Sequence, residues 1–235
     1  MRADAHALVE SAAAPFRAAG HFAWHFARGK LRYDPVFLAL VTRGAFPDGV
    51  RVLDLGCGQG VLFALLVAAQ RRFDAREWPD AWPRPGAGLA MRGIDLRLEA
   101  VRRARVALGA HAAFEHGDVC DARLGEADVV VMMDVLHYLA PGRQEALLDA
   151  IAHTVPRGGC FITRVADATA GARYAVTRAG DWLVTLVRGT LRPRFHCRPA
   201  ADWSALLARH GFSVAAEPMS AGTPFANVLL TATRR

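Results

Sequence analysis

The chain has 235 residues, of which 53% are hydrophobic and 22% charged, so it is long enough to bury one large core or two small ones. This composition excludes disordered, collagen-like and low-complexity classes. The formal charge of +7 is almost entirely arginine, because Lys30 is the only lysine. The arginines are dispersed and form no run of like charges, which argues against nucleic acid as a partner.

The cysteines and the first residues bear on compartment. The four cysteines lie far apart without a CxxC pair, which predicts no metal site and favours a reduced, cytoplasmic compartment. Asp, His and Glu interrupt the apolar residues at the start of the chain, so neither a signal peptide nor a membrane span is expected. Peripheral membrane contact stays open, as does the choice between a monomer and a homodimer.

Residues 1–48 predict an N-terminal helical cover. Apolar side chains such as Leu8, Phe16 and Phe22 stand among alanines, which indicates one or two helices before a turn at Asp34-Pro35. This segment precedes the core of the fold rather than belonging to it.

From Val50 the pattern changes to short β-rich runs that alternate with helical stretches. Strands are expected in RVLDL, MRGID, AAFEHGD, ADVVVMMD and GGCFITRVA, with helices of ten or more residues among them. Such alternation predicts crossover units and a parallel sheet with right-handed connections. We therefore expect residues 50–165 to form the core of an α/β fold.

Two stretches depart from this alternation. Residues 71–90 are rich in Pro, Gly and Trp and predict an insertion, whose role as a lid, a dimer contact or a surface loop stays open. Residues 167–200 predict one or two helices and a Pro-rich connection. Residues 201–235 predict a terminal helix and a pair of strands, of which the last is antiparallel.

The first expected strand runs directly into Gly56, Gly58 and Gly60 and then into a helix. Glycines allow a sharp turn and a close approach of the backbone to a ligand, and the helix start offers free N–H groups. The spacing is GxGxG rather than the GxGxxG of dinucleotide sites, and Asp54 ends the strand. Without a diphosphate to bind, this carboxylate can serve a cationic ligand.

With these residues the sequence resembles the class I S-adenosylmethionine-dependent methyltransferases, whose first motif is (D/E)xGxGxG. Later segments resemble that family's motifs in the same order: GID at 93–95, GDV at 117–119, DVVVMMDVLHYL at 128–139 and VPRGGCFI at 155–162. The resemblance implies a single domain over residues 1–235, with the cofactor-binding core at 50–165. It also implies a doubly wound, Rossmann-like, seven-stranded sheet, mostly parallel with one antiparallel strand near the C-terminus and helices on both faces.

The resemblance assigns roles within these motifs. S-adenosylmethionine would be the cofactor, S-adenosylhomocysteine the product, and no metal would be used. Asp95 would bind the ribose hydroxyls, Asp118 the adenine amino group, and Val119 would flank the ring. The cofactor-binding set is Asp54, Gly56, Cys57, Gly58, Gly60, Asp95, Leu96, Asp118, Val119 and Asp134. Asp95 follows Gly60 by 35 residues instead of the usual separation of about 20, and the insertion accounts for the excess.

A smaller set of residues is expected to act on the substrate. His137 is the candidate general base, and Asp134 is a second candidate catalytic residue. Candidates for covering the substrate or the cofactor are Lys30, Arg32, Tyr33, Tyr138, Arg164 and Trp182.

The acceptor is constrained mainly by what the motifs lack. The fourth motif has no (D/N)PP(Y/F) and no Pro-Cys nucleophile is present, which disfavours methylation of nucleic-acid bases. The apolar flanking segments predict a hydrophobic small molecule, of aryl, polyketide-like or acyl type, free or bound to a carrier protein, with an oxygen or carbon acceptor. ARGKLRYDPVF resembles methyltransferases of bacterial aryl-polyene and pigment pathways. The alternatives are an RNA methyltransferase and a non-catalytic S-adenosylmethionine-binding partner or scaffold.

Overall fold

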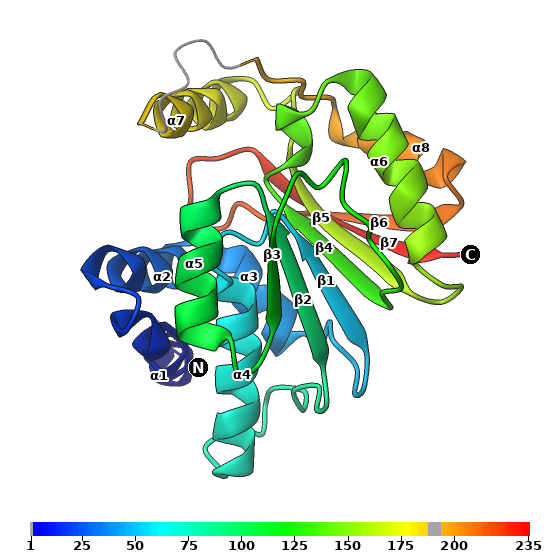
Figure 1. Ribbon diagram of the computed structural model, residues 1–235. Helices are drawn as coiled ribbons and strands as arrows, with labels where there is room; N and C mark the ends of the chain where they lie inside the picture. Colours follow the sequence, from blue (N-terminus) through cyan, green and yellow to red (C-terminus); the bar gives the residue numbers. More distant parts are fainter. Residues whose placement is uncertain (1, 188–193) are drawn as a thin grey trace. The chain divides into compact units, whose positions relative to one another are not determined.

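The computed structural model describes residues 2–187 and 194–235, and Figure 1 shows their course. These residues form a seven-stranded sheet with the order β3-β2-β1-β4-β5-β7-β6. The strands are β1 (Arg51–Leu55), β2 (Ala90–Asp95), β3 (Ala113–His116), β4 (Val129–Met133), β5 (Cys160–Ala166), β6 (Phe212–Pro218) and β7 (Asn227–Arg234). Strand β7 runs antiparallel to both β5 and β6. The expected Rossmann-like fold with one reversed strand near the C-terminus is confirmed.

Eight α-helices and two short 3-10 helices are found in the described residues. The α-helices are α1 (Arg2–Ala13), α2 (His21–Tyr33), α3 (Pro35–Thr42), α4 (Val61–Asp74), α5 (Leu98–Leu108), α6 (Pro141–Thr154), α7 (Ala172–Val187) and α8 (Ala200–Arg209). The 3-10 helices are η1 (Ala14–Arg17) and η2 (Leu136–Tyr138). None of the helices described here is long and apolar enough to cross a membrane.

By its internal contacts the chain divides into two compact units. The first unit is Met1–Arg123 with Ala127–Val129, and the second unit is Leu124–Glu126 with Val130–Arg235.

In the first unit, β1 and β3 pair with β2 in parallel, and three N-terminal helices pack against α4. Helix α4 reads VLFALLVAA and is buried along almost all of this stretch. A helix that is apolar all round must be covered on every side, which gives α1, α2 and α3 their packing surface. Figure 1 shows these helices, coloured blue, beside α4.

The chain turns at Asp34-Pro35 as expected, but this turn is also the start of a third helix. The Val36 N–H donates to Asp34 Oδ1 at 3.2 Å, and Pro35 occupies the first helical position. Asp at the N-cap followed by Pro is a helix-start signal, because both satisfy or remove unpaired N–H groups.

The expected insertion at 71–90 begins too early. Helix α4 continues to Asp74, because no proline occurs before Pro79, and the non-helical part is 75–89. This part folds back on itself: Trp78 Nε1 donates to the Pro83 carbonyl at 3.1 Å, and the Trp78 and Trp82 rings meet edge to face. Its function is not indicated by these contacts.

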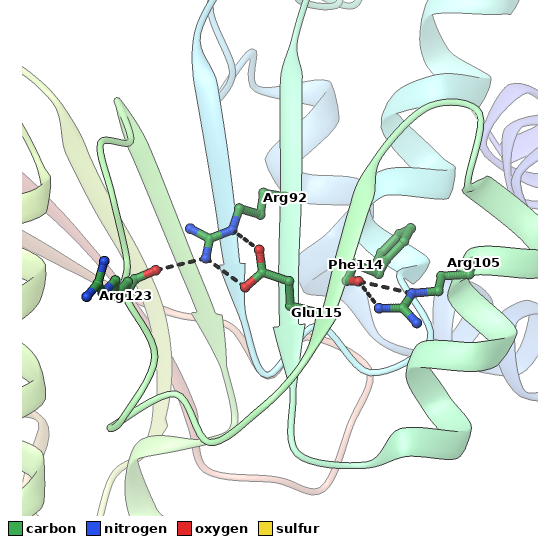
Figure 2. A network of polar contacts seen from close by, with 5 residues as sticks. All are labelled: Arg92, Arg105, Phe114, Glu115 and Arg123. Carbon is green, nitrogen blue, oxygen red and sulfur yellow. Dashed lines mark hydrogen bonds and ion pairs between the residues drawn. The ribbon is translucent and has the colours of Figure 1, made fainter.

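Polar contacts fix the edge strand β3 and its neighbours (Figure 2). Arg92 on β2 pairs through both Nε and Nη2 with the Glu115 carboxylate on β3, and also donates to the Arg123 carbonyl. Arg105 on α5 donates twice to the Phe114 carbonyl, at 3.1 and 2.6 Å. These contacts tie β3 to β2 and α5, so the ring of Phe114 is held in a defined place.

In the second unit, the antiparallel pairs β5–β7 and β6–β7 carry α8, which packs on β6 and β7. Thr163 Oγ1 donates to the Met132 carbonyl at 2.7 Å, which links β5 to β4. The expected helical segment at 167–200 contains α7, and residues 188–193 of it lie outside the described residues.

Candidate active site

The loop between β1 and α4 is a tight turn in which three glycines adopt left-handed backbone conformations. Gly56, Gly58 and Gly60 have φ values of +82°, +58° and +80°, in the region that residues with a Cβ rarely adopt. A Cβ on Gly60 would lie 2.9 Å from the Phe114 ring, so a side chain is also excluded by contact. The turn is anchored to β2, because the N–H groups of Gly56 and Cys57 donate to the Ile94 carbonyl at 2.8 and 3.2 Å.

Asp54 is a buried carboxylate for which the described residues supply no hydrogen-bond donor. It is 5% exposed, at the end of β1 just before the glycine turn. Burial, with a smaller contribution from the charge of Asp95, raises its pKa from 3.8 to about 8. A carboxyl group in this state lacks a cationic or hydrogen-bonding partner, and a ligand that carries a cation can supply one.

Asp95 ends β2 and is also 5% exposed, but its carboxylate has partners. The Gly58 N–H donates to Oδ2 at 2.7 Å, and Arg97 donates to Oδ1 from its backbone N–H at 2.9 Å and from Nε at 3.2 Å. The acid at the end of β2 is thereby tied to the glycine turn, 37 residues earlier in the chain.

Asp118 follows β3, and its Oδ1 accepts the Cys120 N–H at 2.9 Å in a local turn. Its neighbour Val119 is 7% exposed, whereas Leu96, the other apolar candidate, is 66% exposed. The exposed Leu96 side chain is therefore available to contact a ligand beside Asp95.

Cys57 contributes to packing. Its thiol lies against the backbone of Gly93, where a Cβ would be only 2.7 Å from Sγ. Burial, and after it the charges of Asp54 and Asp95, raise the pKa of this thiol, so it stays protonated and unreactive.

The first unit therefore combines a glycine turn with three carboxylates, two of them in the last residues of β1 and β2 and the third just after β3. Carboxyl ends of parallel strands are where open α/β sheets bind ligands. Asp54, which no donor among the described residues contacts, fits a cationic group, and Asp95 can accept hydrogen bonds from a diol. These residues fit S-adenosylmethionine, which carries an ammonium group and a ribose.

In the second unit, Asp134 and Arg164 form an ion pair. Arg164 on β5 is 3% exposed, and its Nε and Nη2 donate to the two oxygens of Asp134, with Nε at 2.8 Å. Asp134 directly follows β4 and has φ of +58°, an uncommon conformation for a residue other than glycine. The ion pair holds the Asp134 carboxylate in a fixed orientation.

His137 in η2 is 7% exposed and is close to this ion pair. Burial lowers its pKa to about 4; the Asp134 charge opposes this shift, and Arg178 and Arg164 add to it. The imidazole is therefore neutral near pH 7, which is the form that can accept a proton.

The aromatic rings of Tyr138 and Phe195 lie beside His137. The rings of Tyr138 and Phe195 lie 4.2 and 5.9 Å from the imidazole, centroid to centroid, and the Arg178 guanidinium lies 4.5 Å from the Phe195 ring. The segment that carries Phe195 is fixed, because the His196 N–H donates to the His137 carbonyl at 2.8 Å. We call His137, Tyr138, Phe195 and Arg178 the aromatic cluster.

The remaining cover candidates are placed as follows. Lys30 on α2 forms an ion pair with Asp34, the C-cap residue of the same helix, with Nζ 2.7 Å from the carboxylate. Tyr33 at the end of α2 is 72% exposed. The guanidinium of Arg32 lies over the Tyr33 ring. Trp182 on α7 is 49% exposed.

Sequence reasoning missed three residues. Gln59, inside the glycine turn, is buried and donates to the Ala23 carbonyl at 2.7 Å, which ties α2 to the turn. Arg97 could have been noticed as a cation two residues after Asp95. Arg178 had no local signal, because its relation to Phe195 depends on how the chain folds.

Residues 23–217 match a protein family described as a methyltransferase domain, which covers most of the chain. Together with the fold, this match defines a class I S-adenosylmethionine-dependent methyltransferase, and S-adenosylmethionine is the cofactor. The chain belongs to that methyltransferase-domain family.

Individual relatives are more distant. The chain is 28% identical over 119 residues to a carboxy-S-adenosyl-L-methionine synthase of Campylobacter curvus, a match over 49% of this chain and 44% of the relative. The chain thus spans less than half the length of this curated relative.

Solved structures share the fold. Magnesium protoporphyrin IX methyltransferase from Synechocystis PCC 6803, with bound S-adenosylhomocysteine, superposes with a TM-score of 0.59 at 24% identity, over 92% of this chain and 88% of that one. Mitomycin 7-O-methyltransferase gives a TM-score of 0.61 at 20% identity, over 89% and 56% of the two chains.

Proposed function

We propose that this methyltransferase acts on a hydrophobic small molecule of aryl, polyketide-like or acyl type. The observation that carries the proposal is the aromatic cluster, in which a buried neutral imidazole lies among aromatic rings and an arginine. Aromatic side chains offer large apolar contact areas and stack on flat ligands. The solved neighbours named for magnesium protoporphyrin IX and mitomycin are methyltransferases of small organic molecules, which supports the same substrate class.

The cofactor would be held by residues of the first unit. In this proposal Asp54 pairs with the ammonium group, Asp95 accepts the ribose hydroxyls, and Asp118 accepts the adenine amino group. Gly56, Gly58 and Gly60 allow the close approach of the backbone. When bound, S-adenosylmethionine supplies the methyl group for direct displacement.

His137 would take the proton of a hydroxyl or carbon acceptor. Its imidazole is neutral near pH 7, because its pKa is lowered to about 4. The Asp134 carboxylate, held by Arg164, favours the imidazolium that forms when the proton arrives. Orientation of the acceptor supplies much of the remaining rate, because the leaving thioether needs no protonation.

The test is an incubation with methyl-labelled S-adenosylmethionine and separate panels of phenols, aromatic acids, acyl thioesters and transfer RNA. We expect label in a hydrophobic small molecule together with release of S-adenosylhomocysteine. Label in RNA alone, with binding that weakens steeply in salt, would favour an RNA methyltransferase instead. Cofactor binding without any product would identify a non-catalytic binding protein.

A further inference from the structure

The ion pair between Asp95 and Arg97 lies inside the proposed cofactor site, and the inference drawn from it rests on that proposed site. Asp95 already accepts three hydrogen bonds, from Gly58 N, Arg97 N and Arg97 Nε. A carboxylate offers about four acceptor positions. A ribose diol needs two of them, so one of the three present donors must give way.

The guanidinium is the donor that can leave. The N–H groups of Gly58 and Arg97 belong to the glycine turn and to the start of α5, and moving either would distort the backbone. The Arg97 side chain is 44% exposed, and Asp95 is the carboxylate within ion-pair distance of it among the residues that the structure describes. An ion pair this exposed is weak, so it can open at small cost.

The same guanidinium also covers the glycine turn. A Cβ built on Gly58 would lie 3.2 Å from Arg97 Nη2, so the guanidinium lies over the α-carbon of Gly58. By contrast, a Cβ on Gly60 would meet the core residues Phe114 and Leu108. A ligand that approaches the backbone at Gly58 closely meets the guanidinium first.

Arginine is a poor choice for this position on helix grounds alone. Arg97 is the N-cap of α5 and makes no capping hydrogen bond with its side chain. Ser, Thr, Asp and Asn are favoured at N-caps, and a positive charge is unfavourable at a helix N-terminus. A residue that violates local preference in this way is expected to serve the site instead.

We propose that Arg97 sets the affinity for the cofactor by competing with the ribose for Asp95. In the cofactor-free protein its guanidinium holds Asp95 and covers Gly58. When the ribose hydroxyls bind Asp95, Nε leaves Oδ1 and the guanidinium moves toward solvent. Arg97 is thus a positioning residue that acts through Asp95 and takes no part in methyl transfer.

The test is calorimetric titration of S-adenosylhomocysteine into the full-length wild type and into Arg97→Met, which keeps an unbranched side chain but removes the charge and its donors. We expect Arg97→Met to bind about fivefold more tightly, the equivalent of about 1 kcal/mol for an exposed ion pair. Arg102→Met, on the exposed face of the same helix, is the matched control and should bind like the wild type.

Two further readouts separate competition from a structural effect. Raising the salt concentration from about 0.05 to about 0.5 M should narrow the difference in affinity between the wild type and Arg97→Met, because the Arg97–Asp95 ion pair that salt screens is present only in the wild type. On an Asp95→Asn background, Arg97→Met should bring no gain, since the two substitutions act through one contact.

The outcomes distinguish this inference from the proposed site. Equal or weaker binding by Arg97→Met, with normal binding by the wild type, overturns the competition and leaves the cofactor assignment intact. A gain that persists on the Asp95→Asn background shows that Arg97 does not act through Asp95. Failure of both the wild type and Arg97→Met to bind S-adenosylhomocysteine overturns the site and the competition together.

Discussion

At the scale of single residues, the two buried carboxylates of the first unit differ in their partners. Asp95 is surrounded by donors, whereas Asp54 has none among the described residues. Their sequence contexts are alike, because each stands at the end of a short apolar strand. The difference comes from the glycine turn, which aims the Gly58 N–H at Asp95.

Asp95→Ala tests the ribose-binding role. Removing this acceptor should weaken S-adenosylhomocysteine binding by about 1–3 kcal/mol, the usual cost of lost hydrogen bonds to a charged group. Isothermal titration calorimetry measures the change, with Asp80→Ala in the exposed loop as the control. Unchanged affinity in Asp95→Ala would refute the assignment.

Asp54 makes a pH-dependent contribution to the stability of the cofactor-free protein. Its pKa is about 8 in the folded state and 3.8 in the unfolded chain, so the folded state retains a proton between these values. Its contribution is present below about pH 4 and is lost as the pH rises through 8. Asp54→Asn should therefore weaken the decline in unfolding free energy between pH 5 and 8, and should be more stable than the wild type at pH 8 by about 1 kcal/mol or more. Urea unfolding at a series of pH values tests this; parallel curves for the two proteins would contradict it.

At the scale of elements, the junction of β1, α4 and β3 depends on Gly60. A side chain there would meet the Phe114 ring at 2.9 Å in a backbone conformation with φ of +80°. Phe114 cannot move freely, because Arg105 on α5 binds its carbonyl and β3 is tied to β2 (Figure 2).

Gly60→Ala should therefore destabilise the protein by about 2–4 kcal/mol, the sum of overpacking and backbone strain. Gly142→Ala in the first turn of α6 is the control, because a Cβ added at Gly142 would have no atom within 4 Å and alanine favours helix. Chemical denaturation of both variants gives the comparison, and equal stability of the two would show that the turn tolerates a side chain.

The Asp134–Arg164 pair adds an ion pair between the end of β4 and β5, beside the Thr163 hydrogen bond to Met132. Asp134→Asn keeps the side-chain shape and tolerates the left-handed backbone, but leaves the buried guanidinium of Arg164 without its carboxylate. We expect a loss of at least about 2 kcal/mol in unfolding free energy, since breaking one half of a buried pair strands the other. Glu115→Gln, which breaks the exposed Arg92–Glu115 pair, should cost less than about 1 kcal/mol. If Asp134→Asn lowered the unfolding free energy less than Glu115→Gln does, the Asp134–Arg164 pair would not be the stronger of the two ion pairs.

At the scale of the whole molecule, the family match crosses both compact units, since it extends from residue 23 to residue 217. S-adenosylhomocysteine that binds the folded protein but not the unfolded chain should stabilise the folded state. At 100 times the dissociation constant, the gain is about 2.7 kcal/mol, which raises the melting temperature by roughly 5–10 °C. Differential scanning calorimetry measures this rise, and Asp95→Ala at the same ligand concentration should show a smaller one. An absence of any rise in the wild type would exclude tight binding to the native state.

Much of the architecture was predictable because it depends on local pattern. Alternating apolar runs and helices predicted every strand of the sheet, and the GxGxG spacing predicted the turn before α4. The boundaries of α4 and the start of α3 were less predictable, since helices end where capping and packing stop them rather than at the first irregular residue.

The sequence by itself determined the fold class, the glycine turn and the acids at the carboxyl ends of β1, β2 and β3, because each depends on residues adjacent in the chain. Only the tertiary structure decided which of these acids has partners. Asp54 is left without a donor among the described residues, Asp95 meets Gly58 and Arg97, and Asp134 meets Arg164. Such differences arise because burial and through-space contacts between distant segments set the charge state and the hydrogen bonds of a carboxylate, and neither is written in local sequence.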